Sequence, residues 1–465
     1  MSQAKELKEK LFNNFSNGYK AMSEDALTAC ETYAKGYMAF LDKNRTEREC
    51  ALFAEKQLLE NGFKPIDEQR TAPYKPGEKV FKILHNKAVI AAVIGKQPLL
   101  SGVKIAAAHI DSPRLDLKPN PLYESDDMAF FKTHYYGGIK KYQWTAIPLA
   151  LHGVICKADG EKITVNIGDD PADPQFVVTD LLPHLAQEQM KREARQIVKA
   201  EELNLLIGSV PFKDDEESEL VKLNILNILF QKYGITERDF LSAELCAIPA
   251  FPVREIGFDR SMIGGYGHDD KVCAYPALTA LLECGVPENT CISVLVDKEE
   301  IGSEGNTGMQ CDFLRYFIAD LARPEGLPGR DVIRHSTCIS ADVNAGFDPT
   351  FPDVVDKRNC AYVNKGVCLT KYTGSGGKGG SNDASAEFIN YLRRIYDEKG
   401  VLWQIGELGK TDLGGGGTVA KYIAKLDVET VDLGVPVLSM HAPFEIISKV
   451  DLYNAHLAFK EYFMA

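Results

Sequence analysis

The sequence predicts an α/β protein in which a mixed, mostly parallel sheet is flanked by helices. Short apolar, β-branched runs alternate with longer segments whose apolar residues recur every three or four positions. A stretch with shorter β-like runs, from about Leu115 to Leu245, interrupts this alternation. We therefore expect one α/β domain formed by residues 1–114 and 246–465, with residues 115–245 inserted as a separate β-rich unit.

The expected elements follow in chain order. The first ninety residues are expected to be largely helical, with helices over 26–41 and 47–59, the second closed by Asn61-Gly62. Two adjacent strands, joined by a turn near Pro98, are expected at 88–94 and 103–108. Strands of the insert are expected at 146–155 and 162–167. The remaining elements are helices at 271–284, 384–398 and 418–426 and strands at 291–296, 338–341 and 435–440.

Composition narrows the functional class. A chain of 465 residues with 45% hydrophobic and 26% charged residues is typical of a soluble globular protein with two domains. Its formal net charge of -13 argues against a nucleic-acid partner, whose phosphates would be repelled. The eleven cysteines form no Cys-x-x-Cys pair, which favours a reducing, cytoplasmic location. No apolar run approaches the ~20 residues that a membrane span requires, so no membrane partner is expected.

The strongest chemical signal is the pair Glu299-Glu300, just beyond the apolar run 291–296. Ligands of open α/β sheets bind at the carboxyl ends of the strands. Adjacent side chains point in different directions, so one carboxylate can hold a cation while the other moves a proton. Two solvated charges in a turn are the alternative interpretation.

Four further segments place a metal-ligand type of residue after a strand or before a helix. These residues are His109, Asp269, Asp342 and His441. With Glu300 they make two imidazoles and three carboxylates, a set that suits a site for two zinc or two cobalt ions. Calcium would favour more oxygen ligands and no histidine. Glu299 remains uncommitted and is the candidate acid/base.

These segments resemble the aspartyl aminopeptidase family of dinuclear metallo-aminopeptidases, which includes the vacuolar aminopeptidase I type. The order, spacing and local context of the segments agree over nearly the whole chain. The matching stretches are Ala108 to Pro113, Asp269 with Ala277-Leu278, Asp297 to Ser303, Ser340-Ala341-Asp342, and Asp432-Leu433-Gly434 through Met440-His441.

The resemblance implies a zinc-exopeptidase type of fold and removal of N-terminal residues from peptides. It implies two divalent metal ions, with zinc favoured and cobalt or manganese as alternatives. Carried over by position, one ion would be held by His109 and Asp342, the other by Glu300 and His441, with Asp269 bridging them. Asp111 would brace His109, and Glu299 would be the general base. The family also implies that the insert is a dimerisation domain and that the protein is a dimer-based homo-oligomer such as a dodecamer.

Substrate contacts are also suggested by the resemblance. Lys365, seven residues before Tyr372, resembles a family lysine near the specificity pocket, although a lysine in a loop is commonly a surface residue. Gly417 and Thr418 match a Gly-Thr close to the substrate, and the alternative is a flexible lead-in to the helix at 418–426. The sequence leaves the preferred N-terminal residue open.

Other functions remain open on residue types alone. A two-metal deacylase or carboxypeptidase could use the same ligands, as could a phosphoesterase. A protein of another class would be a non-catalytic assembly that the metals only stabilise. The free Glu299 argues against such an assembly, because a structural site needs no base.

Overall fold

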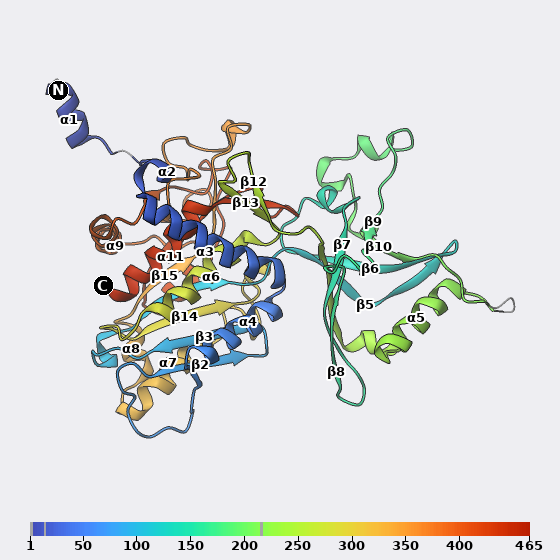
Figure 1. The fold of residues 1–465 in the computed structure, drawn as a ribbon, viewed down its shortest axis with the longest axis horizontal. Helices are drawn as coiled ribbons and strands as arrows, with labels where there is room; N and C mark the ends of the chain where they lie inside the picture. Colours follow the sequence, from blue (N-terminus) through green and yellow to red (C-terminus); the bar gives the residue numbers. More distant parts are fainter. Residues whose placement is uncertain (1–2, 14, 214–216) are drawn as a thin grey trace.

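The computed structural model describes residues 3–13, 15–213 and 217–465, and it has two lobes (Figure 1). The division expected from the sequence also spans residues 1, 2, 14 and 214–216, which lie outside this description. The larger lobe contains the blue helices α2 to α4 (18–60) and the red C-terminal helix α11 (Lys449–Met464), and the smaller one contains the teal and green strands β5 to β10 (114–208) and the green helix α5 (Leu220–Tyr233) (Figure 1). No described helix is both long enough and apolar enough to cross a membrane.

The larger lobe is built on a nine-stranded mixed sheet. Its four central strands, β14, β4, β15 and β19, are parallel, because each pairs with its neighbour in the same direction. In spatial order the strands are β1 (Lys64–Pro65), β2 (Lys79–Leu84), β3 (Ala88–Val93), β14 (Cys291–Val296), β4 (Lys104–His109), β15 (Thr337–Ala341), β19 (Glu429–Gly434), β17 (Val367–Thr370) and β18 (Trp403–Ile405).

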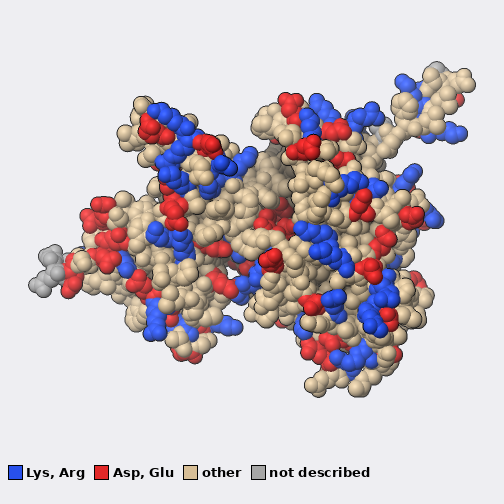
Figure 2. All heavy atoms as spheres, turned by 180° about the vertical axis from the view of Figure 1, so that it is seen from behind, with Lys and Arg blue, Asp and Glu red and all other residues tan. Residues whose placement is uncertain are grey.

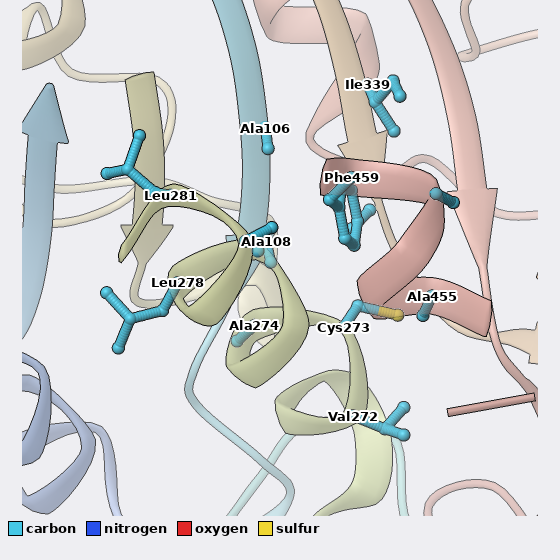
Figure 3. Close-up of a cluster of buried hydrophobic side chains, with 14 of the residues drawn as sticks. Ala106, Ala108, Val272, Cys273, Ala274, Leu278, Leu281, Ile339, Ala455 and Phe459 are labelled. Carbon is cyan, nitrogen blue, oxygen red and sulfur yellow. The ribbon is translucent and has the colours of Figure 1, made fainter. Parts of the chain in front are cut away.

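Helices cover both faces of this sheet. One face packs against α3 (Glu24–Lys43), α4 (Glu47–Glu60), α6 (His268–Glu283), α9 (Ala386–Lys399) and α11 (Lys449–Met464). The other face packs against α7 (Phe313–Ala322), α8 (Gly329–Ile333) and α10 (Ala420–Ala424). In Figure 3 α6 and α11 lie close to β4 where the strand presents the small side chains of Ala106 and Ala108. At the start of β4, Lys104 donates to the carbonyl of Tyr462 on α11.

The structure confirms the α/β class and corrects several details. The strands expected at 88–94 and 103–108 are not neighbours, because β14 pairs between them. The N-terminal region is less helical than expected, since β2 completes a hairpin with β3. The expected helix at 418–426 shortens to α10. The strand expected at 435–440 is β20 (Pro436–Leu438), and it belongs to a different sheet.

That different sheet is small and joins distant parts of the chain. Its five strands, in spatial order, are β12 (Arg254–Ile256), β13 (Met262–Gly265), β21 (Glu445–Ser448), β20 and β16 (Asn344–Ala345). Because β16 begins two residues after Asp342 and β13 lies just before Asp269, this sheet holds segments that the sequence singled out.

The second lobe is a seven-stranded sheet with one long helix, α5 (Leu220–Tyr233). All its strands lie between Arg114 and Pro249, close to the expected insert. In spatial order they are β8 (Lys162–Ile167), β7 (Leu149–Cys156), β11 (Ala243–Pro249), β5 (Arg114–Ser125), β6 (Met128–Tyr136), β10 (Asn204–Gly208) and β9 (Val177–Val178). From behind, the surface is hollowed between the lobes, and acidic side chains are visible in the hollow (Figure 2).

Candidate metal centre

Three adjacent parallel strands end at the candidate residues. His109 is the last residue of β4, and it lies opposite Val296, the last residue of β14. Glu299 and Glu300 follow β14 in a short 3-10 turn, and Asp342 follows β15 directly. Since neighbouring parallel strands end at the same edge of a sheet, four of the candidate side chains meet there.

The remaining two candidates come from the small sheet. Asp269 follows β13 at the start of α6, and His441 follows β20. Both strands pair with β21, so the two residues are brought to the same place although they are far apart in the sequence. The left-handed backbone of His441, with φ 64°, turns the chain sharply at this point.

The candidate side chains form one compact cluster. Asp269 lies between the two imidazoles, with Oδ1 3.2 Å from His109 Nε2 and Oδ2 3.1 Å from His441 Nε2. His441 Nε2 is also 3.4 Å from Glu300 Oε2. Ligand atoms of His109, Glu299 and Asp342 lie within 4.8 Å of one another, and so do those of His109, Asp269 and Glu300.

The charges in this cluster are strongly coupled. Burial, together with the charges of Asp111 and Asp269, raises the pKa of Glu299 to about 7. Burial also raises the pKa of Glu300 and of Asp342 well above the usual range, again with a contribution from neighbouring carboxylates. Burial works against charge on the His441 ring, but Asp269 and Glu300 raise its pKa to about 10.

The donor set fits divalent cations. Oδ1 of Asp269 and Oε1 of Glu300 are buried and accept no hydrogen bond from any described residue. Buried carboxylates that repel one another are costly without a compensating positive charge. Bound cations would supply that charge and would coordinate the free oxygens, and imidazole nitrogens beside carboxylates suit zinc.

Asp111 organises the base of the cluster. Its Oδ1 accepts the backbone N–H of Glu299 at 3.2 Å, and its Oδ2 accepts that of Glu300 at 3.2 Å. Oδ2 also accepts the hydroxyl of Tyr136 at 2.7 Å, and Oδ1 lies 3.2 Å from His109 Nδ1. A carboxylate in this position orients the imidazole so that Nε2 faces the cluster.

Two residues outside the expected set hold His441 and Asp269. The carbonyl oxygen of Gly138 lies 2.8 Å from His441 Nδ1 and accepts a hydrogen bond from this nitrogen when it carries a proton. The buried carboxyl of Glu445 accepts the backbone N–H of His441 at 2.7 Å and that of Asp269 at 3.1 Å. Sequence reasoning missed Glu445, although a single carboxylate beside the apolar Ile446-Ile447 was a usable signal.

A cavity of about 420 Å³ opens onto the cluster. Gly417 and Thr418 line it, and Thr418 donates a 2.6 Å hydrogen bond to Asp432, a buried cavity residue that was not expected in the site. Lys365 and Tyr372 are not brought to this cavity. Lys365 lies over the ring of Tyr362 and lines a separate depression, and Tyr372 donates to Glu407.

The fold and the site define a metal-dependent hydrolase of the α/β class. A family model described as aminopeptidase I zinc metalloprotease (M18) matches residues 40–463. The chain belongs to this family of zinc metallo-aminopeptidases, as the resemblance implied, and it is an exopeptidase. The family assignment favours this activity over a deacylase, a carboxypeptidase, a phosphoesterase or a non-catalytic assembly.

Individual relatives agree with this assignment. A Clostridium acetobutylicum protein named probable M18 family aminopeptidase 1 is 47% identical over 458 residues, covering 97% of this chain and 98% of its own length. A crystal structure of an M18 aminopeptidase from Thermotoga maritima has a TM-score of 0.92 at 42% identity, and the match covers 97% of this chain and 99% of that chain. A structure of the Saccharomyces cerevisiae mApe1 dodecamer has a TM-score of 0.75 at 20% identity and covers 93% of this chain and 96% of that chain, so it shares the fold.

Proposed function

We propose that the cluster binds two divalent metal ions, with zinc favoured over cobalt and manganese, and that it hydrolyses the first peptide bond of a substrate. His109 and Asp342 would hold one ion, Glu300 and His441 the other, and Asp269 would bridge them. The placement of Asp269 supports this assignment, because its two oxygens each face a different imidazole at 3.1–3.2 Å. When bound, such ions lower the pKa of a shared water and polarise the peptide carbonyl.

Glu299 is the proposed proton carrier. Its carboxylate would take a proton from the attacking water and pass it to the leaving amine. The two glutamates have separate roles, since the carboxylate of Glu300 lies beside His441 Nε2 whereas Glu299 groups with His109 and Asp342. Asp111 keeps both in place through their backbone N–H groups.

The cavity indicates which substrates fit. Among its described lining residues, the side chains are carboxylates, one imidazole and neutral groups such as those of Val343, Leu408 and Met440, and none is a lysine or arginine. A substrate with a neutral or basic first residue would therefore be favoured over one with an acidic first residue. Gly417 and Thr418 are proposed to contact the substrate backbone, since both line this cavity.

We also propose that the Arg114–Pro249 lobe is a dimerisation unit within a larger homo-oligomer. Its helix α5 is apolar on several sides, yet only Val221 of it is buried, while Leu223, Ile228 and Phe230 are exposed. A helix of that character requires a second covering surface, and a second copy of the chain would supply one.

The decisive experiment compares Glu299→Gln with Glu304→Gln, an exposed glutamate of the same loop. Both proteins would be stripped of metal, reloaded with zinc, cobalt or manganese, and assayed on a panel of aminoacyl anilides and N-blocked peptides. We expect Glu299→Gln to keep its metal and lose turnover by about two to four orders of magnitude, whereas Glu304→Gln stays active. Near-normal turnover of Glu299→Gln would remove Glu299 from its role.

A companion variant tests the ligand set. His441→Ala should lower the metal content measured by elemental analysis, because it removes a nitrogen that faces both Asp269 and Glu300. An unchanged metal content would exclude His441 as a ligand. Hydrolysis of N-blocked peptides rather than free aminoacyl anilides would overturn the exopeptidase assignment.

A further inference from the structure

A segment of the second lobe only a few residues long contacts the metal centre. Tyr136 ends β6, and Gly137 and Gly138 follow it; we call these three residues the Tyr136–Gly138 segment. All three belong to the lobe whose strands lie between Arg114 and Pro249, whereas every candidate ligand belongs to the larger lobe. The segment therefore links two separately folded sheets.

Tyr136 reaches the centre through Asp111. Its hydroxyl donates to Asp111 Oδ2 at 2.7 Å, and the same carboxylate accepts the backbone N–H groups of Glu299 and Glu300. The ring of Tyr136 is itself held, because the guanidinium of Arg114 lies over it, 4.2 Å from the ring centre. The hydroxyl thus fixes the rotation of Asp111, and Asp111 fixes the turn that carries the two glutamates.

The two glycines also lie against residues of the metal centre: Gly138 against His441 and Gly137 against Glu300. The carbonyl of Gly138 lies 2.8 Å from His441 Nδ1, which leaves His441 Nε2 directed at Asp269 and Glu300. Gly137 has φ +78°, and a Cβ added there would meet Pro113 at 3.3 Å and Glu300 Cβ at 3.4 Å. A residue with a side chain would be strained at this position, and only glycine lets the segment lie against the glutamate turn.

We propose that the Tyr136–Gly138 segment is a positioning element of the catalytic centre, through which the second lobe aligns the Glu299-Glu300 turn and the His441 ring. The inference rests on the proposed roles of those residues. Tyr136 acts through Asp111 and touches no reacting atom. The second lobe accordingly has two roles, since the lobe proposed for assembly also sets the geometry of the metal centre.

The test is Tyr136→Phe, which removes one hydroxyl and keeps the ring on Arg114. Tyr135→Phe is the matched control, because this neighbour is 37% exposed and alternation along the strand points it to the other face. We expect Tyr136→Phe to lower kcat about tenfold with KM within about twofold, and to weaken zinc affinity about tenfold in a chelator competition, as loss of a contact behind a metal ligand does. Tyr135→Phe should change neither quantity.

A double-mutant cycle with Asp111→Asn shows whether the hydroxyl acts through that carboxylate. In the Asp111→Asn background, Tyr136→Phe should produce less than about a twofold further loss of kcat and of zinc affinity. Equal effects of Tyr136→Phe in the two backgrounds would overturn the proposal. So would values for Tyr136→Phe that match Tyr135→Phe, or a loss confined to thermal stability. Those results would leave the metal-dependent activity of the wild-type enzyme, and hence the proposed function, untouched.

Discussion

Deprotonation of His152 should weaken the junction between the two lobes. His152 lies on β7 of the second lobe and is fully buried. Its Nδ1 lies 2.7 Å from Glu49 on α4 of the first lobe, and its Nε2 lies 3.1 Å from Asp169. Burial works against its charge, but these two carboxylates raise the pKa of His152 from 6.5 to about 9.

The shift fixes both the sign and the size of the effect. Between the two pKa values the folded state holds a proton that the unfolded state releases, so stability falls as the pH rises. The contribution is fully present below about pH 6.5 and is lost as the pH passes about 9. A rise of the His152 pKa from 6.5 to about 9 corresponds to about 3 kcal/mol of unfolding free energy.

Urea unfolding of the wild type and of His152→Gln, from pH 6 to pH 9.5, measures this contribution. The difference between the two proteins should be larger at pH 6 than at pH 9.5 by about 3 kcal/mol, because other titrating groups cancel in the subtraction. His134→Gln, at an exposed histidine of the same lobe, is the control and should show no such trend. Parallel curves for the wild type and His152→Gln would refute the reasoning.

Three further outcomes can be checked. Glu445→Gln should weaken zinc affinity by about 10- to 100-fold in a chelator competition, because it disturbs the hydrogen bonds that hold the backbone N–H groups of Asp269 and His441. An affinity within about twofold of the wild type would contradict this. Lys365→Ala should leave the ratio of kcat/KM for aspartyl and leucyl anilides unchanged within about twofold, since Lys365 lies outside the cavity. A selective loss of activity on the aspartyl anilide would show that Lys365 contacts the substrate. Ala108→Leu should lower the unfolding free energy by about 1–3 kcal/mol, measured in urea, because Ala108 is fully buried in the core between β4 and α6; an unchanged unfolding free energy would contradict this.

The sequence was sufficient for the parallel core because its strands are short, apolar and buried on both faces. The runs at 291–296 and 338–341 became β14 and β15 with little change in their bounds. Strand order was harder to predict, because neither turn chemistry nor hydrophobicity shows that β14 inserts between β3 and β4. The small sheet was also missed, since its strands are only two to four residues long and pair across large separations in the sequence.

The site shows the same division between what residue types predict and what only packing reveals. His109 and His441 were singled out because each directly follows a predicted strand, and Asp269 because it precedes a predicted helix; together they formed a plausible ligand set. The supporting roles of Tyr136 and Glu445 depend on hydrogen bonds to residues far along the chain, and only the carboxylate of Glu445 beside the apolar Ile446-Ile447 offered a local signal. Lys365 is the opposite case. It resembles a family lysine by its position in the sequence, yet the structure places it outside the cavity.

The small sheet also sets when the enzyme can begin to work during its own synthesis. Its strands draw on the middle of the chain and on the stretch ending at Ser448, so Asp269 and His441 are brought together only after Ser448 has been made. Since domains fold as the chain emerges from the ribosome, a polypeptide that has not reached Ser448 carries most of the proposed ligands but no finished centre. A nascent peptidase of this design is therefore silent towards the free N-termini around it until the last strand of the small sheet has been made.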